Sequence, residues 1–183
     1  MINFLGSDIL DKGLFIINTG NGKGKTTAAM GMVLRSLGYG YRCAVIQFIK
    51  DESFESGERE ALKKLGCVFE TYGKGFTWEN SEEENAEAFL KGFESAEKKI
   101  VSGEYDLIVL DEMNCCINEN CFGAKDKEDI VKLISSRNDG TTLVFTGRGA
   151  PGWLIAMADT VTEMKEIKHA FNNGTEPVRG IEY

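Results

Sequence analysis

The fold of this chain is decided by the stretch Thr19-Gly20-Asn21-Gly22-Lys23-Gly24-Lys25-Thr26-Thr27. The short apolar run Leu14-Phe15-Ile16-Ile17 precedes it, and residues 26–37 follow it with apolar residues at helical spacing. This order predicts a buried strand, a tight turn and a helix. Glycines in such a turn let backbone N–H groups point inward around phosphate oxygens, and the positive end of the helix dipole adds to the attraction. The stretch therefore predicts a phosphate-binding loop.

The pattern is that of a P-loop, G-x-x-x-x-G-K-[ST], except that Thr19 stands where the first glycine is usual. We expect Lys25 to reach the phosphates as a point charge and the Thr26 hydroxyl to ligate Mg²⁺. The alternative is a turn rich in glycine and lysine that binds nothing, and the agreement of strand, helix and Gly-Lys-Thr argues against it. The candidate nucleotide-binding residues are Gly20, Asn21, Gly22, Lys23, Gly24, Lys25, Thr26 and Thr27.

A second strand ends in two carboxylates. Residues 107–110 read Leu-Ile-Val-Leu, and Asp111-Glu112 follow directly. In P-loop proteins an acidic residue at the end of a neighbouring strand binds the metal, directly or through water. An acidic turn after a buried strand is the simpler interpretation, but the P-loop favours a role in binding. Thr26, Glu112 and Asp111 are therefore the candidate metal-binding residues.

Strand and helix patterns alternate along the whole chain. Predicted strands cover residues 14–17, 43–48, 67–71, 107–110, 142–145 and 160–164; predicted helices cover 26–37 with Gly38 as its stop, 57–65, 81–103 after the capping box Ser81-Glu82-Glu83-Glu84, 126–136 and 151–158. Several strands are continuously apolar, as expected when both faces of a sheet are covered. The sequence thus predicts one α/β domain over residues 1–183, with a mainly parallel sheet, helices on both faces and a short N-terminal segment, 1–12.

Composition limits the partners. Asp and Glu number 29 against 21 Lys and Arg, a net charge of −8, which disfavours nucleic-acid binding and adhesion to anionic lipid. No apolar run approaches the roughly 18 residues of a membrane span, and the first lysine is Lys12, so no secretory signal is expected. The five cysteines contain no C-x-x-C pair, which favours reduced, space-filling thiols. We expect a cytoplasmic protein that binds neither nucleic acid nor membrane.

Two features remain open at this level. Residues 72–78, Tyr-Gly-Lys-Gly-Phe-Thr-Trp, place Phe76 and Trp78 among glycines outside any periodic element. Either this loop folds its aromatic rings back on the body, or it offers a flat apolar surface to a ligand. The single histidine, His169, is interpreted as structural.

The order of motifs resembles that of a known family. The segments TGNGKGKTTAA, VIQFIK, GFTW, VLDEMN, TGRGAP, ADTVTEM, KHAF and GIEY follow one another between residues 19 and 183. They are similar to the ATP:corrinoid adenosyltransferases of the cobalamin-adenosylating, P-loop type. The resemblance includes the shortened P-loop, so the threonine at position 19 fits this family.

The resemblance implies an activity. Such enzymes bind MgATP and a corrinoid reduced to Co(I), whose cobalt attacks the 5′ carbon of ATP; the products are a cobalt–carbon bond and triphosphate, in adenosylcobalamin biosynthesis or corrinoid salvage. It further implies that Asn21, Gly22, Gly24, Lys25, Thr26 and Thr27 bind the triphosphate, and that Thr26 and Glu112 hold Mg²⁺ with Asp111 beside them. Phe76 and Trp78 match an aromatic pair next to the corrinoid that helps displace its lower axial ligand. Lys25, Phe76 and Trp78 are thus the expected catalytic residues.

Partners follow from the same resemblance. It implies a homodimer, a separate flavoprotein reductant, and cobalamin, cobinamide or a precursor as the corrinoid. The segment before the first strand is short, so the element that covers the corrinoid is expected to be abbreviated or supplied by the partner subunit. From the residues alone, a P-loop phosphotransferase for a small metabolite stays open, with Arg148 as its one obvious lid arginine. A nucleotide switch is also open, although the lack of N-K-x-D argues against a GTPase.

Overall fold

A parallel sheet forms the centre of the molecule. The computed structural model describes residues 12–50, 56–75 and 80–182. Within these residues six strands pair in the order β3-β2-β4-β5-β1-β6, and each pair is parallel. The strands are β1 (Phe15–Thr19), β2 (Cys43–Phe48), β3 (Val68–Tyr72), β4 (Leu107–Asp111), β5 (Thr142–Thr146) and β6 (Thr160–Glu163). The predicted α/β class is confirmed.

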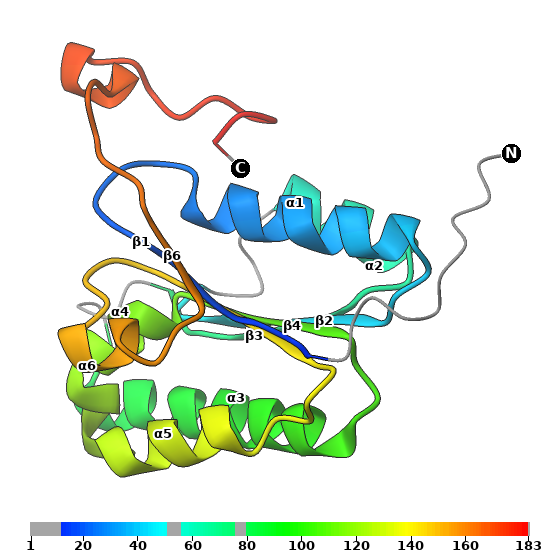
Figure 1. Ribbon diagram of the computed structural model, residues 1–183. Helices are drawn as coiled ribbons and strands as arrows, with labels where there is room; N and C mark the ends of the chain where they lie inside the picture. The colour runs from blue at the N-terminus through cyan, green and yellow to red at the C-terminus, as the bar shows by residue number, and fades with distance from the viewer. Residues whose placement is uncertain (1–11, 51–55, 76–79, 183) are drawn as a thin grey trace, which may run out of the picture.

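Helices cover both faces of this sheet. In Figure 1, α1 and α2 lie on one face and α3 and α5 on the other, while α4 and α6 lie near the edge where the strands end. The helices are α1 (Lys25–Gly38), α2 (Gly57–Lys64), α3 (Glu82–Ser102), α4 (Met113–Asn118), α5 (Lys127–Ser135) and α6 (Gly152–Ile155), with short 3-10 turns at Asn120–Gly123 and Ala170–Asn173. Because parallel strands all end at one edge, the loops that follow them gather there.

Local sequence signals explain most helix ends. The Ser81 side chain accepts a hydrogen bond from the Glu84 backbone and the Glu84 side chain accepts one from the Ser81 backbone, so the predicted capping box starts α3. Gly103 ends it with a left-handed φ of 68°. Helix α1 ends at Gly38, the expected stop, and the left-handed φ of 81° that follows belongs to Gly40. Helix α4, only six residues long, was not predicted.

The apolar core has one layer on each face. Alternate residues of β2 point to opposite sides, so Ile46 packs in the layer that contains α3 and α5, and Val45 in the layer that contains α1. Both are fully buried, and every residue of β4 is buried as well. The Phe15 and Phe145 rings meet edge to face at 5.0 Å, which ties β1 to β5. Continuous apolar runs in the sequence thus correspond to strands that are covered on both faces.

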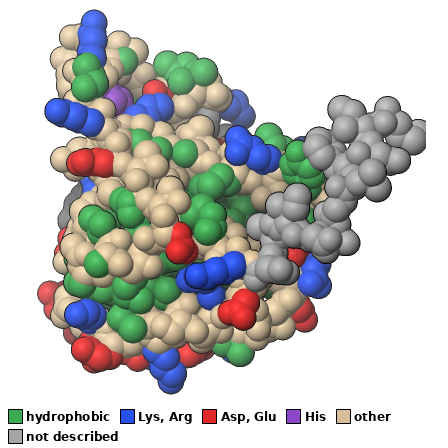
Figure 2. Space-filling view, viewed as in Figure 1, with side chains coloured by type: hydrophobic (Ala, Val, Ile, Leu, Met, Phe, Trp, Pro, Cys, Tyr) green, Lys and Arg blue, Asp and Glu red, His purple; other side chains and the backbone are tan. Residues whose placement is uncertain are grey.

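The charged side chains on the face seen in Figure 2 do not gather into a patch of one sign. Among the described residues no helix has the length and apolar character to cross a bilayer. Figure 2 shows acidic and basic side chains scattered over this face. Beyond β6 the chain leaves the body and returns to the α1 side of the sheet, with Ile167 and Phe171 largely exposed.

Candidate functional site

The glycine-rich stretch that was predicted to bind phosphate lies between β1 and α1, as expected. Gly24 caps α1 with a φ of 110°, and Lys25 is the first helical residue. Gly20 has a φ of 97°, and a Cβ there would lie 2.5 Å from the Met164 carbonyl oxygen. The Gly22 N–H donates to that same carbonyl at 2.6 Å. The loop is therefore packed directly on the segment that follows β6, which only glycine permits at position 20.

Thr19 has a structural task of its own. Its side chain is buried, and its Oγ1 accepts a hydrogen bond of 3.1 Å from the Ala150 N–H. Its carbonyl accepts another, of 2.8 Å, from the Met164 N–H. A glycine in this place would lose the link to the loop after β5. The departure from the usual P-loop pattern thus joins the phosphate loop to its neighbours.

Lys25 lies at the base of the loop with a nearly buried side chain. Its Nζ donates to the Gly22 carbonyl at 2.7 Å. Burial lowers the pKa of Lys25 from its ordinary 10.5; the nearby Glu112 carboxylate acts in the opposite direction, and the Arg148 guanidinium lowers it further. The surroundings therefore disfavour the charged lysine as it stands, and an incoming anion would relieve that cost.

Asp111 is fully buried and fully engaged. Its Oδ1 accepts hydrogen bonds from the Thr26 hydroxyl at 2.8 Å and from the Thr146 hydroxyl at 2.6 Å. Its Oδ2 accepts one of 2.8 Å from Gln47 Nε2, and the Lys50 ammonium lies 3.8 Å away. Because Thr26 donates its proton to Asp111, the lone pairs of the Thr26 hydroxyl are free to face a metal ion.

Glu112 is half-buried at the start of α4. Its φ of 64° is left-handed, and its N–H donates to Thr146 Oγ1 at 3.0 Å, which fixes the turn after β4. The Cys115 thiol donates to Glu112 Oε2 at 3.0 Å. Burial, reinforced by the Glu112 charge, raises the pKa of Cys115 to about 12, so this thiol stays protonated.

The donors present suit magnesium. Thr26 offers a hydroxyl and Glu112 a half-buried carboxylate, which are the hard oxygen ligands that Mg²⁺ prefers. Asp111 is buried and already accepts three hydrogen bonds, so it contributes by holding the Thr26 hydroxyl. Mg²⁺ is usually held by one or two carboxylates together with substrate phosphates and water. In the described ranges no cluster of three or more His, Cys, Asp or Glu side chains forms a self-contained metal site. The residues therefore fit a metal that arrives with a nucleotide.

The structure brings together most of the residues singled out from the sequence. Lys25, Thr26, Asp111 and Glu112 meet where β1 and β4 end. Lys23 lies at the exposed rim, where its ammonium donates to the Glu182 carboxylate and, at 3.2 Å, to the Ile181 carbonyl. The other loop positions, Asn21 and Thr27, are exposed. Phe76 and Trp78 lie outside the described residues.

Several polar residues of the site were missed. Gln47 and Thr146 both hold Asp111, and each could have been found as a polar side chain within an otherwise apolar strand. Asn114 is completely buried, and its Nδ2 donates to the carbonyls of Asn18 and Gly147, at 3.4 and 3.1 Å. It ties β1 to the loop after β5. Asn114 is the last residue of the VLDEMN segment, but its role was not predicted because it belongs to the unpredicted helix α4.

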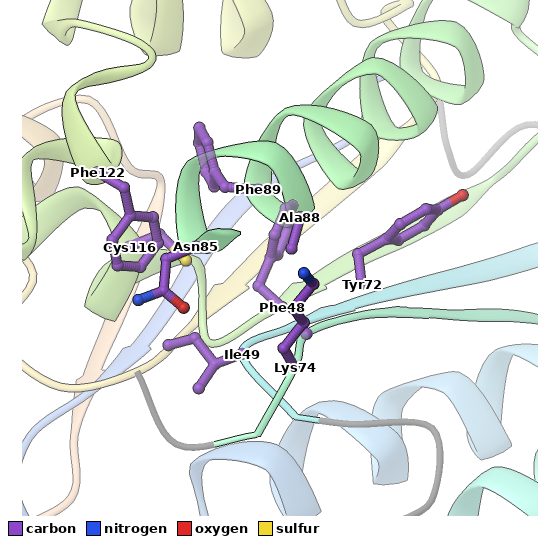
Figure 3. A pocket seen from close by; sticks show the side chains of 10 residues that line it. Phe48, Ile49, Tyr72, Lys74, Asn85, Ala88, Phe89, Cys116 and Phe122 are labelled. Atoms are coloured by element: carbon purple, nitrogen blue, oxygen red, sulfur yellow. The ribbon is translucent and has the colours of Figure 1, made fainter. Parts of the chain in front are cut away.

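A small cavity lies beside this edge. Figure 3 shows its lining, which is mainly apolar and comes from the end of β2, the start of α3 and the 3-10 turn after α4. Its volume is about 10 Å³, room for about one water molecule. A large flat ligand does not fit into a cavity of this size.

Comparison with known proteins identifies the family. Residues 11–183 match the family described as ATP:corrinoid adenosyltransferase BtuR/CobO/CobP. A corrinoid adenosyltransferase of Sinorhizobium sp is 40% identical over 178 residues, which cover 94% of this chain and 81% of that protein. The corrinoid adenosyltransferases of Escherichia coli K12 and Salmonella typhimurium LT2 are each 34% identical over 174 residues, covering 94% of this chain and 87% of theirs. The chain therefore belongs to the ATP:corrinoid adenosyltransferase family, whose members are transferases.

Proposed function

We propose that the protein transfers the 5′-deoxyadenosyl group of ATP to the Co(I) centre of a corrinoid and releases triphosphate. The observation that carries the proposal is the 2.8 Å hydrogen bond from Thr26 to Asp111, which joins the phosphate loop to the acidic end of β4. Together with family membership, this arrangement supports a site for a metal-bound triphosphate. The reaction belongs to adenosylcobalamin biosynthesis or corrinoid salvage.

The residues of the site divide the work on ATP. The backbone of residues 20–27 surrounds the triphosphate, and Lys25 neutralises part of its charge. Thr26 and Glu112 hold Mg²⁺, while buried Asp111 orients the Thr26 hydroxyl. Arg148, whose positive charge helps to lower the pKa of Lys25, is a further cation for the phosphates. A bound Mg²⁺ supplies charge neutralisation of the leaving triphosphate.

The attack itself needs no general base, because the nucleophilic cobalt carries no proton to remove. An electron pair from Co(I) forms the cobalt–carbon bond at C5′, and the C5′–O5′ pair leaves with the triphosphate. The cobalt is thereby oxidised formally to Co(III). The protein contributes position and exclusion of water, and the corrinoid contributes the nucleophile.

The proposal includes features that lie outside the described residues or the single chain. Phe76 and Trp78 face the corrinoid and help remove its lower axial ligand, which makes the cobalt easier to reduce. A separate flavoprotein supplies the electron, and the enzyme works as a cytoplasmic homodimer of single-domain subunits. The partner subunit can complete the cover over the corrinoid. Cobalamin, cobinamide and a precursor are the candidate substrates.

One assay tests the activity. The protein is mixed with MgATP and chemically reduced cobalamin, and the corrinoid spectrum is followed together with the phosphate product. An alkylcobalt spectrum with stoichiometric triphosphate is the expected result. ADP formed on another acceptor, with no change in the corrinoid, would instead indicate a small-metabolite phosphotransferase.

Trp78→Ala tests the aromatic loop. The variant should lose more activity when Co(II) must be reduced on the enzyme than when Co(I) is supplied, because the axial ligand matters for the reduction. Both assays are run on the same preparation, with MgATP affinity measured alongside. Equal losses in the two assays would reject the role in removing the axial ligand.

A further inference from the structure

The chain takes an unusual conformation directly after β2. Ile49 has a φ of 70°, and the Lys50 N–H donates to the Phe48 carbonyl at 2.8 Å. These features define a γ-turn with a positive central φ, which is rare and strained. Ile49 is β-branched, so this backbone conformation is especially unfavourable for it. Such strain persists only where the surroundings enforce it, and it concentrates at functional sites.

The loop after β3 holds this turn in place. The Gly75 N–H donates to the Ile49 carbonyl at 3.1 Å. A Cβ at Gly73 would lie 2.0 Å from the same carbonyl oxygen, so the two backbones are in direct contact. Figure 3 shows Ile49 and Lys74, which both line the small cavity. The same loop continues from Gly75 into the stretch that contains Phe76 and Trp78.

The result of the turn is the position of Lys50. Its ammonium lies 3.8 Å from Asp111 Oδ2, which is beyond hydrogen-bond distance, and its side chain is 32% exposed. Asp111 already accepts three hydrogen bonds, so it does not depend on Lys50 for partners. The Lys50 ammonium therefore lies close to Asp111, the carboxylate that accepts the hydrogen bond from Thr26. It is also exposed enough to bind another anion.

We propose that Lys50 is a substrate-binding residue for the triphosphate, at the end nearest the corrinoid. This inference rests on the proposed function. When the C5′–O5′ bond breaks, its electron pair stays on O5′ of the triphosphate, and Lys50 neutralises that charge while the cobalt pair forms the new bond. Lys25 is anchored on Gly22 within the phosphate loop, whereas Lys50 stands between Asp111 and the loop that leads to Phe76 and Trp78.

The test measures binding of inorganic triphosphate by isothermal titration calorimetry, with and without Mg²⁺. The variants are Lys50→Met, Lys50→Arg and, as a matched control, Lys125→Met. Lys125 has a similar exposure, 29%, and its ammonium lies 3.6 Å from the carboxylate of Asp129, which is far more exposed than Asp111. Thermal unfolding of each variant shows that the fold is intact.

We expect Lys50→Met to weaken triphosphate binding about tenfold or more in both conditions. Lys50→Arg should recover most of the loss, and Lys125→Met should match the unaltered protein. Unchanged binding by Lys50→Met would overturn the inference. A loss seen only with Mg²⁺ would also overturn it, because Lys50 would then act through Asp111 and the metal.

The corrinoid assay of the unaltered protein keeps the two proposals apart. Turnover by that protein together with undiminished triphosphate binding by Lys50→Met refutes the inference and leaves the adenosyltransferase proposal standing. If the unaltered protein shows no corrinoid turnover but Lys50→Met clearly loses triphosphate binding, the inference about Lys50 stands and the adenosyltransferase proposal fails. Lys50 would then bind the phosphates in another nucleotide reaction.

Discussion

Two clusters of polar and charged side chains on the sheet differ in whether their surroundings favour the charged form of the central residue. The first, here named the β3–α3 cluster, comprises Glu70, Tyr72, Ser95 and Lys99. Glu70 accepts hydrogen bonds from Lys99 at 2.8 Å, from Tyr72 at 3.1 Å and from Ser95. Burial alone would raise the pKa of Glu70, but the bonds from Lys99 and Ser95 outweigh it and lower the pKa. The charged carboxylate is thus favoured.

The second, the phosphate-loop cluster, comprises Lys25, Thr26, Asp111 and Glu112. Asp111 is as well satisfied as Glu70, but Lys25 is not, because burial lowers its pKa and a single carbonyl bond holds its ammonium. In the first cluster the charged form of Glu70 is favoured, whereas in the second the charged form of Lys25 is disfavoured by burial. A group perturbed in this way beside a glycine-rich loop is typical of a functional site.

Lys25→Met should have the largest effect and gives the sharpest test of this difference. Turnover and ATP affinity should fall at least about a hundredfold, because the phosphates lose a compact charge in a partly dry site. The free energy of unfolding should stay the same or rise. Folding lowers the pKa of Lys25, so its charge costs stability below that pKa, and the cost disappears as pH rises toward 10.5.

Lys99→Met is the matched variant, since it removes a lysine from the self-contained cluster. It should lose stability and keep ATP affinity, the reverse of Lys25→Met. Chemical denaturation and calorimetry on both proteins measure the two quantities. If both variants lost stability equally, or if Lys25→Met kept near-normal turnover, the distinction between the clusters would be wrong.

The sequence predicted the phosphate-loop cluster better than the other. Lys25 and Thr26 stand in a local pattern, and Asp111 and Glu112 end a recognisable strand, so the meeting of parallel strand ends brings them together. Gln47 and Thr146 reach Asp111 from two further strands. Strand order β3-β2-β4-β5-β1-β6 decides those contacts, and no local pattern encodes it.

The β3–α3 cluster and the turn at Ile49 could not be predicted for a similar reason. Glu70 and Lys99 are 29 residues apart, and each is an ordinary surface residue by its local sequence. Ile49 is a strong strand former whose positive φ contradicts its propensity. Contact with the Gly73 backbone imposes that conformation, so it follows from tertiary structure alone.

Glu70→Gln tests the self-contained cluster with a smaller effect. At neutral pH it should lower the free energy of unfolding by about 1 kcal/mol, since Lys99 loses a charged partner near the surface. The pKa of Glu70 is lowered by folding, so its contribution is fully present above its ordinary pKa and disappears as pH falls through the lowered value. Urea unfolding over that range should show the two proteins converge; a constant difference would assign the loss to packing.

Cys115→Ala should have the smallest effect. The thiol is the hydrogen-bond donor to Glu112 Oε2, and its sulfur accepts from the Arg148 N–H at 3.2 Å, so it links the acidic turn to the loop after β5. A thiol is a weak donor, so its loss should weaken Mg²⁺-dependent ATP binding only about two- to fivefold.

Cys115→Ser restores a donor at that position and should return binding close to the original value, while ATP binding without Mg²⁺ should not change in either variant. Calorimetry at several Mg²⁺ concentrations separates the two cases. Because Glu70 has three donors, loss of its weakest should leave the carboxylate in place. The orientation of the Glu112 carboxylate, by contrast, depends on the hydrogen bond from the Cys115 thiol. Identical binding by the Ala and Ser variants would show that packing, and not the hydrogen bond, holds the Glu112 carboxylate toward the metal.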